Sequence, residues 1–191
     1  MSILKKIKES IVGKPVMDNT YVKGIPLFPN NKNIKHEYVS FDDAYRIALL
    51  TQFRTTQEQD IVHNYRKKII NLGYECEALM FLEEETKDAS IYLQSFGLTD
   101  LDKEGIPQCP RTDRFTIRRF DILINLYFNP CPQLLYISKN SNAKCRVGPF
   151  MDHFTNCSDV LIPVGEEPNL NSLIETINNT LNIKPYVRKE I

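Results

Sequence analysis

Residues 120–150 read FDILINLYFNPCPQLLYISKNSNAKCRVGPF, and this stretch decides the fold. It begins with an apolar run, Ile122–Phe128, that is too continuous for a strand with one face in water. A turn with two prolines follows, then an amphipathic segment at Leu134–Ser141 and a second strand-like run, Cys145–Val147, which ends at Gly148. Strand, crossover helix and strand in this order predict a parallel sheet whose first strand is covered on both faces.

The rest of the chain alternates between strand-like and helix-like patterns in the same way. We expect strands at 45–53, 76–82, 90–96, 122–128, 145–147 and 159–164, and helices at 55–72, 134–141 and 168–182. A helical turn near 99–103 and a short helix before Phe120 complete the pattern. This alternation predicts a three-layer α/β/α sandwich around a mostly parallel, Rossmann-like sheet, with the first and fourth strands as central neighbours.

Three regions are predicted along the chain. Residues 1–40 form an N-terminal arm, residues 41–184 form a single α/β domain, and residues 185–191 form a tail. Within the arm, residues 2–12 place their isoleucines and Leu4 on one face of a short helix that ends at Gly13, and an irregular linker follows. This helix either packs on the domain or docks on a partner, which would be a protein or an anionic lipid surface.

Composition excludes several classes of function. With 191 residues the chain is long enough to bury roughly 70% of its unfolded surface in one domain. Lys+Arg and Asp+Glu balance at 24 each, so no overall field attracts nucleic acid, and no nucleic-acid partner is expected. The sequence has no apolar run of about 18 residues for a transmembrane segment. Lysines interrupt the apolar N-terminal residues, which argues against a secretory signal, so we expect a cytoplasmic protein.

The cysteines predict a reduced core and no metal site. They are widely spaced, with no CxxC pair and no Cys/His spacing of the zinc-binding kind. One alternative is a reactive thiol at Cys131, because a helix N-terminus lowers the pKa of a thiol. The five cysteines are Cys76, Cys109, Cys131, Cys145 and Cys157.

A ligand site is predicted where the first and fourth strands end, because ligands of open α/β sheets collect at such carboxyl ends. Arg54 lies beside the N-terminus of a predicted helix, where it would bind phosphate or carboxylate. In the alternative interpretation Thr55 and Glu58 only cap that helix and Arg54 is solvated. The candidate ligand-binding residues are Gln52, Arg54, Thr55, Asn125, Tyr127 and Asn129, with Phe53 between them.

No motif in the sequence predicts a catalytic residue or a cofactor. The loop after the first strand has no glycine, so a tight dinucleotide or triphosphate site is not expected. Asp121 would lie at the amino end of its strand, which is the wrong end for catalysis, and a salt bridge is the expected role of Arg146. The acidic loop that contains Asp100, Asp102 and Glu104 would form either a solvated edge or a weak cation site. The remaining polar candidates are scattered: His36, His63 and His153, and the loop residues Asp100, Asp102 and Glu104.

A second kind of pattern is carried by the segments Phe120–Leu126, Ile137–Ser138, Ala143–Gly148 and Asp159–Ile162, together with the first strand and Asp100–Pro107. These segments resemble a family of small uncharacterised α/β proteins of bacterial genomes. The likeness extends over about residues 40–183, and that family has no known activity to transfer. At Asn125 the family pattern leads us to expect an aspartate, so a carboxylate that served the family would be lost here.

The same segments are more distantly similar to the N-terminal half of heptosyltransferase-like glycosyltransferases, in which a helix and an Ala-Lys-x-Arg-x-Gly strand follow a strand of this kind. The resemblance implies a nucleotide-sugar site mainly in a second Rossmann-like half. Since this sequence ends before such a half, we do not expect the glycosyltransferase activity to transfer.

Two hypotheses of function follow. The first is a non-catalytic α/β domain that binds a protein partner, through the N-terminal helix, or a small regulatory ligand. The second is a small enzyme or sensor for a phosphorylated or acidic metabolite at the carboxyl edge of the sheet. A convergence of Arg54, Thr55, Asn125 and Tyr127 on one pocket would favour the second.

Overall fold

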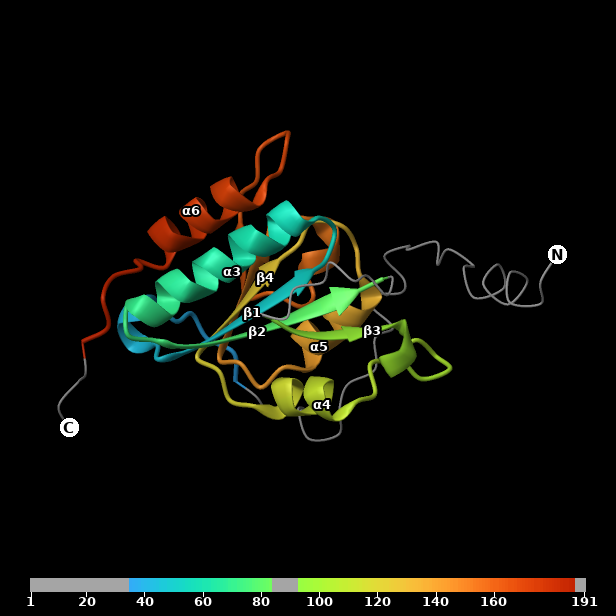
Figure 1. Cartoon of the computed structure of the whole chain (residues 1–191). Helices are drawn as coiled ribbons and strands as arrows, with labels where there is room; N and C mark the ends of the chain where they lie inside the picture. Colours follow the sequence, from blue (N-terminus) through green and yellow to red (C-terminus); the bar gives the residue numbers. More distant parts are fainter. Residues whose placement is uncertain (1–34, 84–92, 188–191) are drawn as a thin grey trace.

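The structure of the chain, a computed structural model, describes residues 35–83 and 93–187. In these residues six strands form one sheet in the order β3-β2-β1-β4-β5-β6, and every neighbouring pair is parallel. The strand arrows accordingly point the same way in Figure 1. The fold prediction is confirmed, as is the central pairing of the first and fourth strands. The strands are β1 (Arg46–Gln52), β2 (Glu75–Leu82), β3 (Gln94–Gly97), β4 (Ile122–Leu126), β5 (Cys145–Pro149) and β6 (Val160–Ile162).

Helices cover both faces of this sheet (Figure 1). Helices α3 and α6 pack together on one face, and α4 and α5 pack together on the other. The bounds are α3 (Thr56–Asn71), α4 (Pro110–Ile117), α5 (Pro132–Asn140) and α6 (Leu170–Thr180), with 3-10 turns η2 (Phe41–Asp43), η3 (Leu98–Asp100) and η4 (Asp152–Phe154). Among the described residues we find no helix with the length and hydrophobicity of a membrane span.

The alternation of side chains along β1 divides the core into two halves. Ile47 and Leu49 point to the α3/α6 face, and Ala48 and Leu50 point to the α4/α5 face. All four side chains are fully buried. The next residue of the second set is Gln52, so the α4/α5 face becomes polar at the carboxyl end of β1.

Helix α3 begins and ends where its sequence predicts, within one residue. Thr55 is the N-cap rather than the first helical residue, and its hydroxyl accepts a hydrogen bond from the Glu58 N–H at 3.1 Å. At the other end Gly73 has a φ of +98°, a backbone conformation that side chains with a Cβ rarely adopt. Glycine is therefore required for the tight reversal into β2.

Several other boundaries differ from the prediction. Strand β4 ends at Leu126 rather than Phe128, and α5 begins at Pro132 because proline is well suited to the first helical position. Strand β3 covers only Gln94–Gly97, and the predicted residues 90–92 of that strand lie outside the described residues. The predicted helix at residues 2–12 also lies outside them.

Candidate functional site

The carboxyl edge of the sheet is where the predicted ligand residues lie, but they divide into exposed and buried side chains. Arg54 and Asn129 are exposed, and Arg54 forms no ion pair with another described residue. Thr55 is occupied as the cap of α3. None of these contacts brings Arg54 and Thr55 together with Asn125 and Tyr127, which is the convergence that would favour a ligand site.

Gln52 is the last residue of β1, and its side chain is 7% exposed. Its Nε2 donates a hydrogen bond of 2.7 Å to Oε1 of Glu83, which follows β2. No described residue bonds to Oε1 of Gln52, although this atom is buried. The amide thus has one acceptor oxygen with unused hydrogen-bonding capacity.

Asn125 is fully buried in β4, and its amide nitrogen is used in hydrogen bonds within the fold. Its Nδ2 donates to the Val147 carbonyl of β5 at 3.1 Å and to Oγ of Ser138 on α5 at 3.0 Å. These bonds fasten α5 to the sheet between β4 and β5. Its Oδ1 is buried without a partner in the described part of the chain.

Tyr127 follows β4 directly and is 3% exposed. Its ring packs against Phe154 of η4, with ring centroids 4.9 Å apart. The hydroxyl is buried and receives no hydrogen bond from the described residues. Burial, with a smaller effect of the nearby thiols Cys157 and Cys131, raises the pKa of this phenol well above its usual value, so the hydroxyl is protonated.

His153 is a fourth polar side chain at this edge, and the sequence analysis named it as one of three scattered histidines but did not place it among the ligand-binding candidates. It lies in η4, which follows β5 after Phe150 and Met151, and its ring centroid is 4.4 Å from that of Phe154. Burial lowers its pKa, against opposing effects from Asp152 and a hydrogen bond with the Phe128 backbone. Nε2 is buried without a partner among the described residues. The signal was available: His153 follows the end of β5 much as Arg54 follows the end of β1.

Four of these residues form what we call the carboxyl-edge row: Glu83, Gln52, Tyr127 and His153. They follow or end β2, β1, β4 and β5, which is the order of these strands in the sheet. Contacts connect them, since Gln52 bonds to Glu83 and the Phe154 ring contacts the rings of both Tyr127 and His153. Gln52 and Tyr127 are neighbours across the sheet, because the residues that precede them, Thr51 of β1 and Leu126 of β4, are paired in the strand register.

The thiols beside the row are not nucleophiles at neutral pH. Burial raises the pKa of Cys131 to about 12, although a backbone hydrogen bond from Leu134 lowers it; the Glu83 carboxylate adds a smaller raising effect. Burial likewise raises the pKa of Cys157 to about 12. All five cysteines are buried and free, as predicted, but the alternative of a reactive Cys131 thiolate is wrong because its position at the start of α5 does not overcome burial.

The other polar candidates serve the fold. Arg146 is held by Asp159 through two bonds of 2.7 and 3.0 Å, which confirms its salt bridge. Asp100 accepts the Gly97 N–H, and Asp102 accepts the N–H groups of two residues in its own loop. In the described residues, no three His, Cys, Asp or Glu side chains lie close enough to hold a metal ion.

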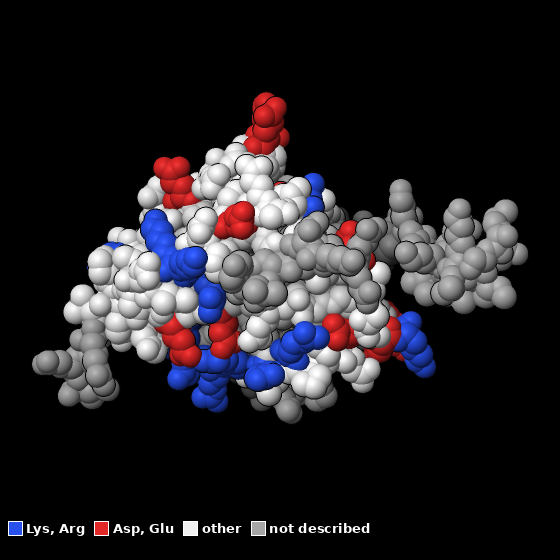
Figure 2. All heavy atoms as spheres, viewed as in Figure 1, with Lys and Arg blue, Asp and Glu red and all other residues white. Residues whose placement is uncertain are grey.

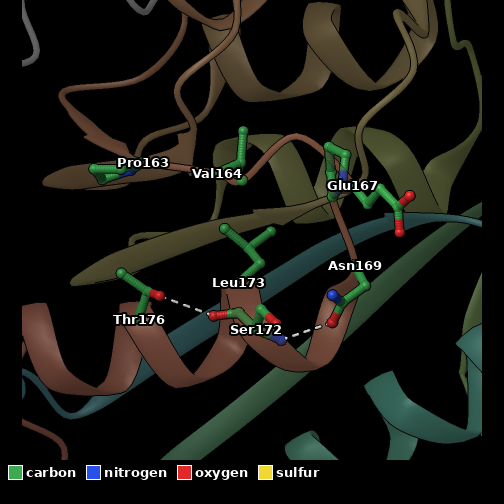
Figure 3. Close-up of a pocket in the computed structure, with 9 residues that line it drawn as sticks. Pro163, Val164, Glu167, Asn169, Ser172, Leu173 and Thr176 are labelled. Atoms are coloured by element: carbon green, nitrogen blue, oxygen red, sulfur yellow. Dashed lines mark hydrogen bonds between the residues drawn. The ribbon is translucent and has the colours of Figure 1, made fainter.

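A small hollow of about 140 Å³ lies elsewhere, between the end of β6 and the start of α6 (Figure 3). Its lining includes Asn169, which caps α6 by accepting the Ser172 N–H at 2.9 Å, and Thr176, which donates to the Ser172 carbonyl. None of the predicted ligand residues lines it.

Comparison with known proteins adds a family but no activity. A search of the curated proteins finds no match. Among solved structures, the glycosyl transferase family 9 protein from Veillonella parvula DSM 2008 matches with a TM-score of 0.49 and 11% sequence identity, over 76% of this chain and 43% of that one. The family of unknown function DUF6913 matches residues 27–183, which is most of the chain and confirms the expected likeness to an uncharacterised family. The chain therefore belongs to this family of unknown function.

Proposed function

We propose that the chain is a non-catalytic binding domain that holds a small polar ligand at the carboxyl-edge row. The observation that supports it most is that Gln52, Tyr127 and His153 each have a buried hydrogen-bonding atom without a described partner. A buried polar atom left without a partner destabilises the fold by about 1–3 kcal/mol. Unpaired atoms at the ends of three neighbouring strands suit a ligand that pairs with them.

The chemistry of the row supports binding rather than catalysis. Burial keeps the Tyr127 phenol of the row and the Cys131 and Cys157 thiols beside it protonated, and it lowers the pKa of His153. Among the ion pairs of the described residues, none joins a carboxylate to His153, so no carboxylate orients this imidazole as in a catalytic triad. The partner-protein hypothesis rests on residues 2–12, outside the described residues, and stays a prediction.

A thermal-shift screen of the full chain against a broad set of metabolites tests the proposal. A ligand at 100 times its dissociation constant adds about 2.7 kcal/mol to the free energy of unfolding. For a chain of this length we expect a rise in Tm of about 5–10 °C. Gln52→Leu, which removes the amide of the row, should abolish this rise.

Gln57→Leu is the matched control, because Gln57 is an exposed glutamine on α3 outside the row. It should keep the full rise in Tm. A hit that survives Gln52→Leu would place binding away from the row, and a flat screen would contradict small-ligand binding altogether.

A further inference from the structure

The hydrogen bonds of the row fix which of its atoms remain open. Nε2 of Gln52 donates to a carboxylate, and a carboxylate only accepts, so the amide orientation is set and Oε1 is the free acceptor. Burial lowers the pKa of His153, and smaller effects of Asp152 and the Phe128 backbone oppose it. Its Nε2 is buried without a described partner, and in the tautomer that carries the proton on Nδ1 this nitrogen is a hydrogen-bond acceptor.

The other two members of the row add further acceptors. Glu83 is exposed and bonds to Gln52 through one oxygen, so its carboxylate is available from solvent at the β2 end of the row. The Tyr127 hydroxyl is the single open group of the row that can also donate. The row therefore offers acceptors at all four positions and a donor at one.

The charges around the row also favour a ligand that donates hydrogen bonds, because most of them are negative and attract a cation. Among the described residues that follow the strands, Glu83 follows β2, Asp152 follows β5, and Glu166 and Glu167 follow β6. Arg54 is the basic residue that follows β1, and its side chain is exposed. Figure 2 shows acidic side chains gathered on the loop that precedes α6. An anion would meet a mostly acidic edge, whereas a cation would be attracted to it.

We propose that the ligand of the carboxyl-edge row is an amine, whose N–H groups donate to Gln52 Oε1, Tyr127 Oη, His153 Nε2 and the Glu83 carboxylate. This inference rests on the proposed function and names its ligand class. Neighbouring strands lie about 4.8 Å apart, so a ligand that contacts the whole row is elongated and carries more than one donor group. A phosphate or carboxylate has no N–H to offer and would face acceptors at every position.

Two probes with the same methylene chain, 1,4-diaminobutane and adipate, distinguish the two classes of ligand. Each is titrated into the ¹⁵N-labelled full chain while the backbone amide signals of Gln52, Tyr127 and His153 are followed by NMR. We expect saturable shifts of these signals with 1,4-diaminobutane and none with adipate. Glu83→Gln should weaken the binding of the diamine at least tenfold, because it removes a charge-assisted hydrogen bond (about 1.4 kcal/mol for each factor of ten).

Glu175→Gln is the control for net charge, since Glu175 is exposed on α6, on the opposite face of the sheet. It should bind the diamine as the parent chain does, and an equal loss in both variants would refute a specific role of Glu83. Shifts of the row with adipate instead of the diamine would overturn the amine assignment while leaving ligand binding at the row intact. Shifts with neither probe would also overturn it, and the metabolite screen then decides the proposed function separately.

Discussion

At the scale of single residues, the Tyr127 hydroxyl is the clearest conflict between stability and binding. Its oxygen is buried without a described partner, so removing it should relieve an unfavourable burial. We expect Tyr127→Phe to leave the free energy of unfolding unchanged or to raise it by about 1 kcal/mol in urea denaturation. The control is Tyr65→Phe, because the Tyr65 hydroxyl donates to Oδ1 of Asn178 at 2.7 Å. It should lose about 1 kcal/mol, and an equal loss in Tyr127→Phe would show that its hydroxyl is paired.

At the scale of an element, α3 tests the alternative interpretation of the Arg54–Glu58 segment. Its N-cap bond joins Thr55 to the Glu58 N–H, and Thr56 is exposed. Thr55→Ala should therefore lower the free energy of unfolding by about 1 kcal/mol in chemical denaturation, as cap removal generally does. Thr56→Ala, one position further, should stay within about 0.5 kcal/mol of the parent. Similar effects in both variants would mean that the cap does not stabilise α3.

The elements also show where sequence reasoning works and where it stops. The apolar runs of β1 and β4 and the 3.6-residue periodicity of α3 are local signals, so the fold and its central strand pair were predictable. The partners of a side chain are not local. No pattern near Asn125 shows that its amide bonds to Ser138 and Val147, and none shows that Gln52 reaches Glu83 across the sheet. The edge of the site was therefore predicted, whereas the division of its residues into bonded and open atoms required the structure.

At the scale of the whole molecule, Asp121 joins the two halves of the sheet at its amino edge. Its carboxylate accepts the N–H groups of Tyr45 and Arg46 at 2.9 Å and pairs with Lys144 at 2.8 Å. Burial alone would raise its pKa, but the bonds from Arg46, Lys144 and Tyr45 outweigh burial, and the pKa lies below its usual value.

A carboxyl with a lowered pKa in the folded state stabilises the fold above its unfolded pKa of about 3.9, and this contribution is lost as the pH falls further. We therefore expect Asp121→Asn to be less stable than the parent at pH 7, and the difference to narrow between about pH 5 and pH 2. Urea denaturation of both proteins across this range measures it. A difference that stays constant with pH would refute the role of the ionised carboxylate.

The pairing of β1 with β4 has a consequence for how the chain is made. Thr51 of β1 bonds to the Leu126 carbonyl, a partner 75 residues later in the sequence. Until β4 has emerged from the ribosome, one edge of the apolar strand β1 has no neighbour to pair with. Closing the long segment between β1 and β4 is also slow compared with forming local contacts. During synthesis the N-terminal half is therefore a nascent chain with an unpaired strand edge. Such an edge is prone to aggregation, and chaperones protect intermediates of this kind.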